Sequence, residues 1–286
     1  MPLILSCVTD SPTAQRVVRA SSLFGRALSL PIRFVQFIAP GDNRPGRLGD
    51  LVAQEMDGAN SLETVQVRRR AADAICSLAG KDRADYIIMG ALARERAVRD
   101  VVGSTARRVA RRAPCSVVLI STAGRDAREW SRFIVGVDYS APSAELATVM
   151  LRLARDGARN STVCFAREHL GFEPESALAS ELDPYIDESV RQAAEQHPLA
   201  SFIDALDTRG VAASAVTLPG RPGQEIARYA EDSRADLLGV LAPARPLGAL
   251  DRLMSHPLIL LLDRLPCSVL LYRPAAGLAA DKKEQR

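Results

Sequence analysis

The 286-residue chain lacks any apolar run near the roughly 18 residues that a membrane-spanning helix needs. Its first residues, Met1–Leu5, lack the basic stretch and long apolar core of a secretory signal peptide. Lys and Arg number 37 against 34 Asp and Glu, so the excess of basic residues typical of a nucleic-acid-binding protein is missing as well. We therefore expect a cytoplasmic protein that contacts neither membrane nor nucleic acid.

Residues that often carry catalysis or hold metals are also scarce. The five cysteines are odd in number and far apart, which argues against a disulfide framework or a zinc site. None of the three histidines forms a spaced pair with an acidic residue, and no Gly-Lys-Ser/Thr element supplies a phosphate-bridging lysine. These absences favour a binding protein over an enzyme.

The segment from residue 90 to residue 105 is the most informative part of the chain. It follows the apolar run Tyr86–Met89 and ends in Gly103-Ser104-Thr105, which opens a basic segment. A strand ending in glycine, then a loop, then a helix beginning at Gly-Ser-Thr can hold phosphate, because glycine allows close approach and a helix start presents free N–H groups. The hydroxyls of Ser104 and Thr105 can cap the helix or donate to a phosphate oxygen.

The spacing of this segment resembles the phosphate signature of the universal stress protein family, Gly-x2-Gly-x9-Gly-Ser/Thr. Gly90, position 93 and Gly103 fall on its three glycine positions, and the chain departs from the signature at Ala93. Ala93 fits if only a small residue is needed there, and fits poorly if the backbone has a positive φ. The flanking runs 84–90 and 112–120 are similar to the family too.

Arginines crowd around this segment. They predict either a solvated helix face or a positive field that attracts polyphosphate. The residues are Arg94, Arg96, Arg99, Arg107, Arg108, Arg111 and Arg112.

Landmarks of the first half recur in the same order in the second half, which indicates a tandem repeat. The polar stretch Thr122–Glu129 has the composition of a linker. We predict two domains, residues 1–122 and 131–275, each resembling a universal stress protein domain. The matching pairs are Pro114–Ile120 with Pro266–Tyr272, Ala84–Ile88 with Ala235–Gly239, and Met1–Asp10 with Arg132–Asp138.

Apolar strands alternate with helices in both halves, which predicts an α/β fold with parallel sheets covered on both faces. The resemblance implies two tandem Rossmann-like domains of the adenine nucleotide alpha hydrolase-like type, each with a five-stranded parallel sheet. The halves differ in the middle. Residues 39–62 predict a loop with little helix, whereas the longer second-half insertion predicts a helix from Pro184 to about Leu206, interrupted by His197-Pro198.

The resemblance places ATP beyond the carboxyl ends of the strands, which also follows from the general rule for open parallel sheets. It implies that Asp10, whose match in the second half is Asp138, lies near the adenosine end, and that the backbone around Phe37 and Ile38 meets adenine. Asp10 can alternatively cap the following helix, or hold Mg²⁺ through water. The expected nucleotide-binding residues are Asp10, Ile38, Gly90, Ala93, Arg94, Gly103, Ser104 and Thr105.

The second half lacks glycine at all three signature positions. Leu241 stands where Gly90 does and Ala244 where Ala93 does, while the third position falls in Ser255-His256-Pro257. A leucine side chain would occupy the space of the phosphates, and Pro257 removes a donor from the helix start. We therefore expect one nucleotide site, in the first half.

The main hypothesis is an ATP-binding stress-response protein with a regulatory role, not an enzyme, although slow hydrolysis is conceivable. The alternative is a family member that binds no nucleotide and serves as an interaction scaffold. An ATP pyrophosphatase relative is disfavoured, because Thr9–Pro12 supplies no Ser-Gly-Gly loop. We also expect the apolar strands Ser116–Ile120 and Ser268–Tyr272 to pair within the chain, giving an internal pseudo-dimer whose exposed faces could support a homodimer.

Overall fold

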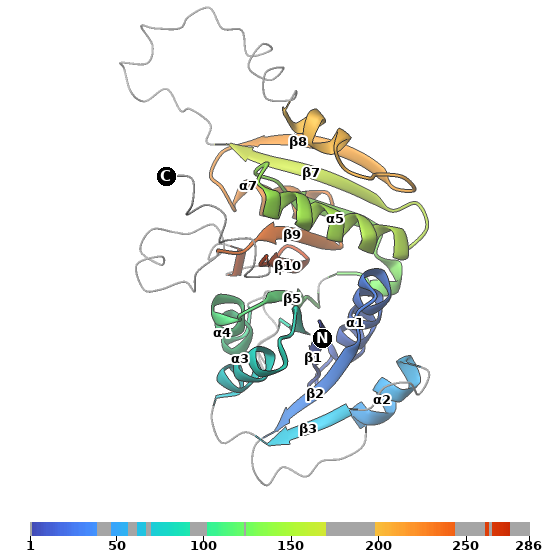
Figure 1. The fold of residues 1–286 in the computed structure, drawn as a ribbon, viewed down its shortest axis with the longest axis vertical. Helices are drawn as coiled ribbons and strands as arrows, with labels where there is room; N and C mark the ends of the chain where they lie inside the picture. The colour runs from blue at the N-terminus through green and yellow to red at the C-terminus, as the bar shows by residue number, and fades with distance from the viewer. Residues whose placement is uncertain are drawn as a thin grey trace, which may run out of the picture.

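A computed structural model describes residues 2–38, 47–56, 62–66, 70–91, 102–122, 124–169, 198–243, 261–262 and 265–274. Strands and helices alternate along both halves (Figure 1). The strands are β1 Ile4–Cys7, β2 Ile32–Ile38, β3 Leu62–Gln66, β4 Tyr86–Gly90, β5 Ser116–Ile120, β6 Arg132–Gly136, β7 Thr162–His169, β8 Ala212–Pro219, β9 Leu237–Leu241 and β10 Ser268–Tyr272. The helices are α1 Ala14–Leu28, α2 Arg47–Glu55, α3 Ala71–Asp82, α4 Ser104–Arg112, the short 3₁₀ turn η1 Ala127–Glu129, α5 Ala141–Asp156 and α7 Glu225–Asp232.

The ten strands of the described residues belong to one sheet, in the order β3-β2-β1-β4-β5-β10-β9-β6-β7-β8. Within each half the strands run parallel, as expected, and the two halves join where β5 and β10 pair antiparallel. Val118 lies opposite Leu270 at the middle of this join. The expected pairing of the two apolar strands is thus confirmed, and each strand covers an edge that would otherwise be exposed.

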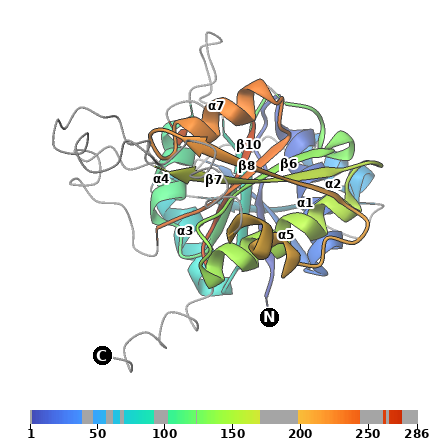
Figure 2. The ribbon, with the colours of Figure 1, turned by 90° about the horizontal axis from the view of Figure 1, so that it is seen from above.

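Helices cover both faces of the sheet and enclose two apolar cores. One core contains side chains of α1, α2 and α5, and the other contains side chains of α3, α4 and α7. Seen from above, α5 and α7 lie on opposite sides of β7 and β8 (Figure 2). Strands β4 and β5 are almost wholly buried because they have helices on both faces and neighbours at both edges.

Helix α2 corrects the expectation that residues 39–62 form a loop with little helix. Leu48, Leu51 and Val52 have the spacing of one helix face, and Leu48 and Val52 are buried in the core that α1 lines. The surrounding glycines, prolines and acidic residues hid this short apolar face in the sequence. In the second half, residues 198–204 are helical as expected, whereas Pro184–His197 lies outside the described residues.

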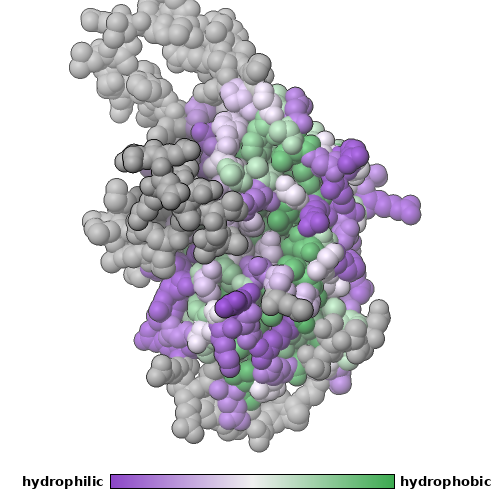
Figure 3. Space-filling model, viewed as in Figure 1, coloured by the Kyte–Doolittle hydropathy of each residue, from purple (hydrophilic) through white to green (hydrophobic). Residues whose placement is uncertain are grey.

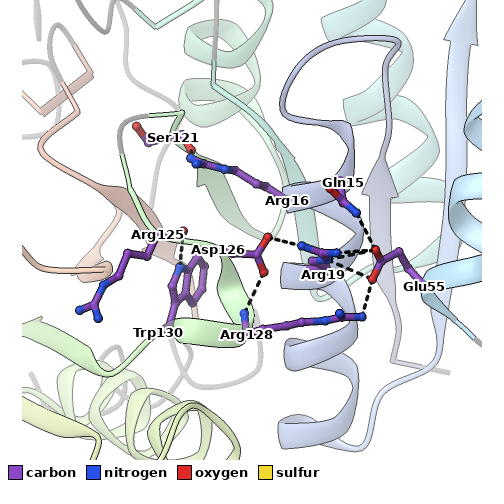
Figure 4. A network of polar contacts seen from close by, with 9 residues as sticks. All are labelled: Gln15, Arg16, Arg19, Glu55, Ser121, Arg125, Asp126, Arg128 and Trp130. Atoms are coloured by element: carbon purple, nitrogen blue, oxygen red, sulfur yellow. Dashed lines mark hydrogen bonds and ion pairs between the residues drawn. The ribbon is translucent and has the colours of Figure 1, made fainter.

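The linker is tied to the first half by a network around Glu55, the last residue of α2 (Figure 4). The Glu55 carboxylate accepts hydrogen bonds from Gln15 (2.8 Å), from Arg19 (2.8 Å to Nη2) and from Arg128 (2.6 Å). Arg19 also pairs with Asp126 of the linker at 2.7 Å. The hydrogen bond from Arg19 is the largest influence on Glu55 and lowers its pKa, so the network holds Glu55 in its charged form.

The linker is tied to the second half through Asp236, a carboxylate that is only 2% exposed. Asp236 accepts hydrogen bonds from the N–H groups of Ser131 (2.8 Å) and Arg132 (2.9 Å) and pairs with Arg125 (3.0 Å). Each charge or polar group in this buried cluster therefore has a partner. The same short linker thus contacts both halves through charged groups.

Candidate functional site

The carboxyl ends of three neighbouring first-half strands bring most of the expected site residues to one edge of the sheet. Strand β1 lies between β2 and β4, so the residues after Cys7, the end of β2 at Ile38 and the end of β4 at Gly90 share this edge. Asp10 is exposed and Ile38 is half-buried there. Ala93 and Arg94 lie outside the described residues.

Gly90 is closely approached by the start of α1. A Cβ atom built on Gly90 would lie 2.6 Å from Oγ1 of Thr13, and 3.5 Å from its Cβ. A residue with a Cβ at this position would therefore have to displace the Thr13 side chain, whether or not a ligand approaches. Sequence reasoning attributed this glycine to phosphate alone and missed Thr13, which is buried at the same edge.

Helix α4 begins at the same edge, after Gly103. Gly103 has an extended backbone (φ −62°, ψ 152°), and its N–H donates to the carbonyl of Ala91, the residue after β4, at 2.7 Å. Among the described residues no side chain caps the helix start, while Ser104 is exposed and Thr105 half-buried. The first N–H groups of α4 therefore have no partner within the helix and carry the positive end of its dipole.

Arg107 contributes a cation at the start of α4. Its Nε donates to the carbonyl of Val102 at 2.9 Å, so the side chain folds back towards the residues that precede the helix. Sequence reasoning included Arg107 among the crowded arginines but expected Arg94 or Arg96 to reach the phosphates. Farther along α4, Arg112 pairs with Asp73 of α3 at 2.8 Å, and hydrophilic residues gather on the side that these two helices cover (Figure 3).

The loop after β1 carries a short chain of hydroxyl groups. The hydroxyl of Thr9 donates to Ser11 at 3.1 Å, and the hydroxyls of Ser11 and Thr13 lie 2.9 Å apart. Thr13 ends this chain against Gly90. Neutral groups that can both donate and accept hydrogen bonds thus line the edge beside Gly90.

Matching hydrogen bonds define how the two halves correspond. In the first half, Asp85 accepts from the N–H of Leu3 and donates its own N–H to the Leu3 carbonyl, both at 2.9 Å. In the second half, Asp236 does the same with Arg132, at 2.9 and 2.8 Å. Leu3 therefore corresponds to Arg132.

This correspondence corrects the expected match of Asp10 with Asp138. Counting from the two anchor residues, Thr9 corresponds to Asp138, and Asp10 corresponds to Tyr139. Asp138 accepts a hydrogen bond from the hydroxyl of Ser140, two residues farther along the chain, at 2.5 Å. Thr9 likewise forms a hydrogen bond with the hydroxyl of Ser11. The sequence comparison matched two aspartates by residue type, whereas the hydrogen-bond ladder decides the register. The expected helix-cap role of Asp10 is not observed either, since the residue before α1 is Thr13.

At Leu241 the carboxyl edge of the second half differs from that of the first half, as the sequence predicts. Gly90 pairs with Ile120 and Leu241 with Tyr272 at equivalent places in the two sheets, so a leucine does take the position of Gly90. Ala244 and Ser255–Pro257 lie outside the described residues.

The cysteines show no sign of activation. Cys7, Cys115 and Cys267 are buried, and burial raises the pKa of all three thiols, that of Cys115 to about 12. Within the described ranges, no group of three or more His, Cys, Asp or Glu side chains is arranged to hold a metal ion. None of the described helices has the length and apolar character that crossing a bilayer requires.

Comparison with known proteins places this architecture in a family. The sequence profile of the universal stress protein family matches residues 2–121 and again residues 129–273. The chain belongs to the universal stress protein family. The two matches cover both halves of the sheet, so this universal stress protein is a tandem member.

Solved structures share the full-length fold at low sequence identity. A protein of unknown function from Pseudomonas aeruginosa PAO1, PA1789, has a TM-score of 0.66 at 16% identity, over 98% of this chain and 95% of its own. A putative universal stress protein from P. aeruginosa UCBPP-PA14 has a TM-score of 0.65 at 16% identity, over 98% and 96%. One from Archaeoglobus fulgidus DSM 4304 has a TM-score of 0.63 at 12% identity, over 96% and 98%. A comparison with curated proteins gives no match.

Proposed function

We propose that this universal stress protein binds one adenine nucleotide, ATP with or without Mg²⁺, at the carboxyl edge of its first half. The observation that carries the proposal is the convergence of Gly90, the uncapped start of α4 and Arg107 on that edge. Backbone N–H groups at a helix start together with a guanidinium suit the phosphates of a nucleotide. In the second half, Leu241 replaces the first glycine.

The nucleotide would act as a regulatory ligand in this proposal. No arrangement of nucleophile, base and metal ligands emerges among the described residues, and the hydroxyl chain Thr9–Ser11–Thr13 suits hydrogen bonding to a nucleotide better than proton abstraction. Within the family, one solved universal stress protein is in complex with cAMP. The proposal for this chain rests on its own first-half geometry.

The decisive experiment is calorimetric titration with ATP, with and without Mg²⁺, of the wild type and Gly103→Val. Valine is compatible with the extended backbone of Gly103, but the residue is buried, so circular dichroism first checks that the fold persists; we expect the new side chain to take the space of the phosphates. We expect about one site per wild-type chain and at least a tenfold loss of affinity in the variant. Gly124→Val is the matched control, since nothing lies within 4 Å of a Cβ built there.

The scaffold alternative is favoured by one specific observation. The Thr13 side chain approaches Gly90 so closely that part of the space beside this glycine is already filled. If the purified protein carries no nucleotide and gives no heat with Mg-ATP, the scaffold function replaces the nucleotide function.

We further propose that a homodimer, if formed, uses exposed faces of the internal pseudo-dimer, because β5 and β10 already cover one another.

A further inference from the structure

Among the described residues, the sheet ends in two edge strands, β3 and β8, which lie at its opposite ends (Figure 1). An edge strand presents unpaired backbone N–H and C=O groups, and proteins usually protect it by keeping it short or charged. Strand β3 follows this rule, because it has five residues and carries Glu63, which pairs with Arg33 at 2.6 Å. Strand β8 does not, since it has eight residues and none of them is charged. The edge at β8 is therefore the one suited to pairing with another strand.

The hydrogen bonds between β7 and β8 show which backbone groups of β8 face the open edge. The N–H of Ala212 donates to the Ser161 carbonyl at 3.3 Å, and that of Gly220 donates to the His169 carbonyl at 2.9 Å. Backbone groups alternate in direction along a strand, so the even-numbered residues of β8 bond to β7 and the odd-numbered residues face outward. The outward-facing residues are Ala213, Ala215, Thr217 and Pro219.

The N–H donors at this edge are arranged symmetrically about Ala215. Pro219 has no N–H. Just before the strand, the N–H of Val211 already donates to the Thr208 carbonyl at 3.1 Å. The outward donors that remain on β8 belong to Ala213, Ala215 and Thr217. Because Ala215 is their midpoint, β8 matches an identical strand that runs antiparallel to it about a twofold axis through this residue.

The side chains of β8 are also complementary in this antiparallel register. Opposing odd-numbered residues would exchange two hydrogen bonds in each pair. Ser214 would lie opposite Val216 of the second copy, and Ala212 opposite Leu218. The exposed small residues 212–215 of one strand thus meet the bulkier residues 216–218 of the other. A parallel pair in register would instead place small residues opposite small ones.

Charge and the internal join of this chain favour a second copy as the occupant. No charge on β8 opposes self-pairing. The nearest charge before the strand, Arg209, is paired with Asp207 at 2.8 Å, and Arg221 lies beyond the turn at Gly220, whose φ is 138°. The chain already joins its own halves by antiparallel pairing of two edge strands, β5 and β10.

We propose that two copies of this chain pair through β8, antiparallel and centred on Ala215, so that the two sheets become continuous. The inference rests on the homodimer proposed above and names its surface, and it is independent of nucleotide binding. One strand pair gives an interface below about 1,200 Å², the size of weak, reversible complexes.

The first test is analytical ultracentrifugation of the full chain over a wide concentration range. We expect a reversible equilibrium between monomer and dimer, with the dimer fraction rising from about 1 µM to about 500 µM. A chain that stays monomeric at every concentration overturns both the pairing through β8 and the homodimer. ATP binding in the first half is measured separately by calorimetry and is unaffected by that result.

Opposite charges at position 215 test the twofold register. Ala215 is exposed, so Ala215→Lys should fold, but pairing would place two like charges directly opposite each other. We expect the dissociation constant of the dimer to rise at least about fivefold. An equimolar mixture of Ala215→Lys and Ala215→Glu should restore the dimer. Thr64→Lys, an exposed change on the other edge strand, is the control and should leave the equilibrium unchanged.

The variant Ala215→Pro tests the backbone donor at the centre of the pair. It removes the outward N–H, while Ser214 and Val216 keep their bonds to β7. We expect at least about a tenfold rise in the dissociation constant, provided that circular dichroism shows the native fold. Unchanged dimers of Ala215→Lys, or no recovery in the Lys–Glu mixture, would overturn the pairing through β8 even if Ala215→Pro does not fold. The homodimer would then use another surface, so the two proposals fail separately.

Discussion

Replacing Gly90 by alanine tests the close approach of α1 to β4. The added Cβ would lie 2.6 Å from Thr13 Oγ1, about 1 Å inside the ordinary contact distance of roughly 3.5 Å. The Thr13 side chain can make room for this Cβ only by losing its 2.9 Å hydrogen bond with Ser11 or by moving α1. Overpacking of this kind costs about 1–3 kcal/mol. The melting temperature should fall by roughly 2–4 °C for each kcal/mol.

The double variant Thr13→Ala/Gly90→Ala separates this clash from a general loss of packing. Thr13→Ala alone should cost about 1 kcal/mol for the lost hydroxyl contact. Because it also clears the space for the new methyl group, the double variant should be more stable than the two single effects predict when added. Urea unfolding of the four proteins, followed by circular dichroism, gives the free energies of unfolding. A Gly90→Ala protein as stable as wild type, or strictly additive effects, would refute the reasoning.

The remaining predictions concern the contacts between the halves. The pKa of Glu55 is lowered in the fold, so Glu55 should stabilise the protein above pH about 5 and lose this contribution as the pH falls through its folded-state pKa. Glu55→Gln should flatten that part of the curve of stability against pH. An unchanged curve would contradict the ion-pair network with Arg19. Arg125→Ala should lower the free energy of unfolding by about 1–3 kcal/mol, because the buried Asp236 loses its cation. A loss below about 0.5 kcal/mol in urea unfolding would show that the backbone N–H groups alone stabilise the Asp236 carboxylate. Leu270→Ala, at the fully buried antiparallel join, should cost about 2–5 kcal/mol, and a smaller loss by calorimetry would mean that the join repacks.

Much of the architecture could be predicted from sequence because it depends on local patterns. Apolar runs bounded by glycine, proline and charged residues defined the strands, and the recurrence of Pro-Cys-Ser-Val at the start of β5 and β10 revealed the repeat. The short helix α2 was missed, since a nine-residue amphipathic face is weaker than the turn-forming residues around it. Its formation depends on packing against α1.

The candidate site was predictable only in part. The sequence predicted the location of Gly90 and the helix start at Ser104, which are local features of a strand–loop–helix unit. It could not place Thr13 beside Gly90, because that contact joins elements far apart in the chain. It also matched Asp10 with the wrong residue of the second half, because the strand register depends on hydrogen bonds between β1 and β4.

The sequence by itself determined that this protein is a tandem of two parallel α/β units that differ in the segment matching the phosphate signature. Periodicity, glycine positions and repeats can all be read directly from the order of the residues. Only the tertiary structure decided that β5 and β10 merge the units into one ten-stranded sheet in a definite register. It also decided that Thr9 takes the place of Asp138, and that the Arg167 guanidinium lies over the Tyr139 ring. These facts depend on contacts between residues distant in sequence, which local patterns do not encode.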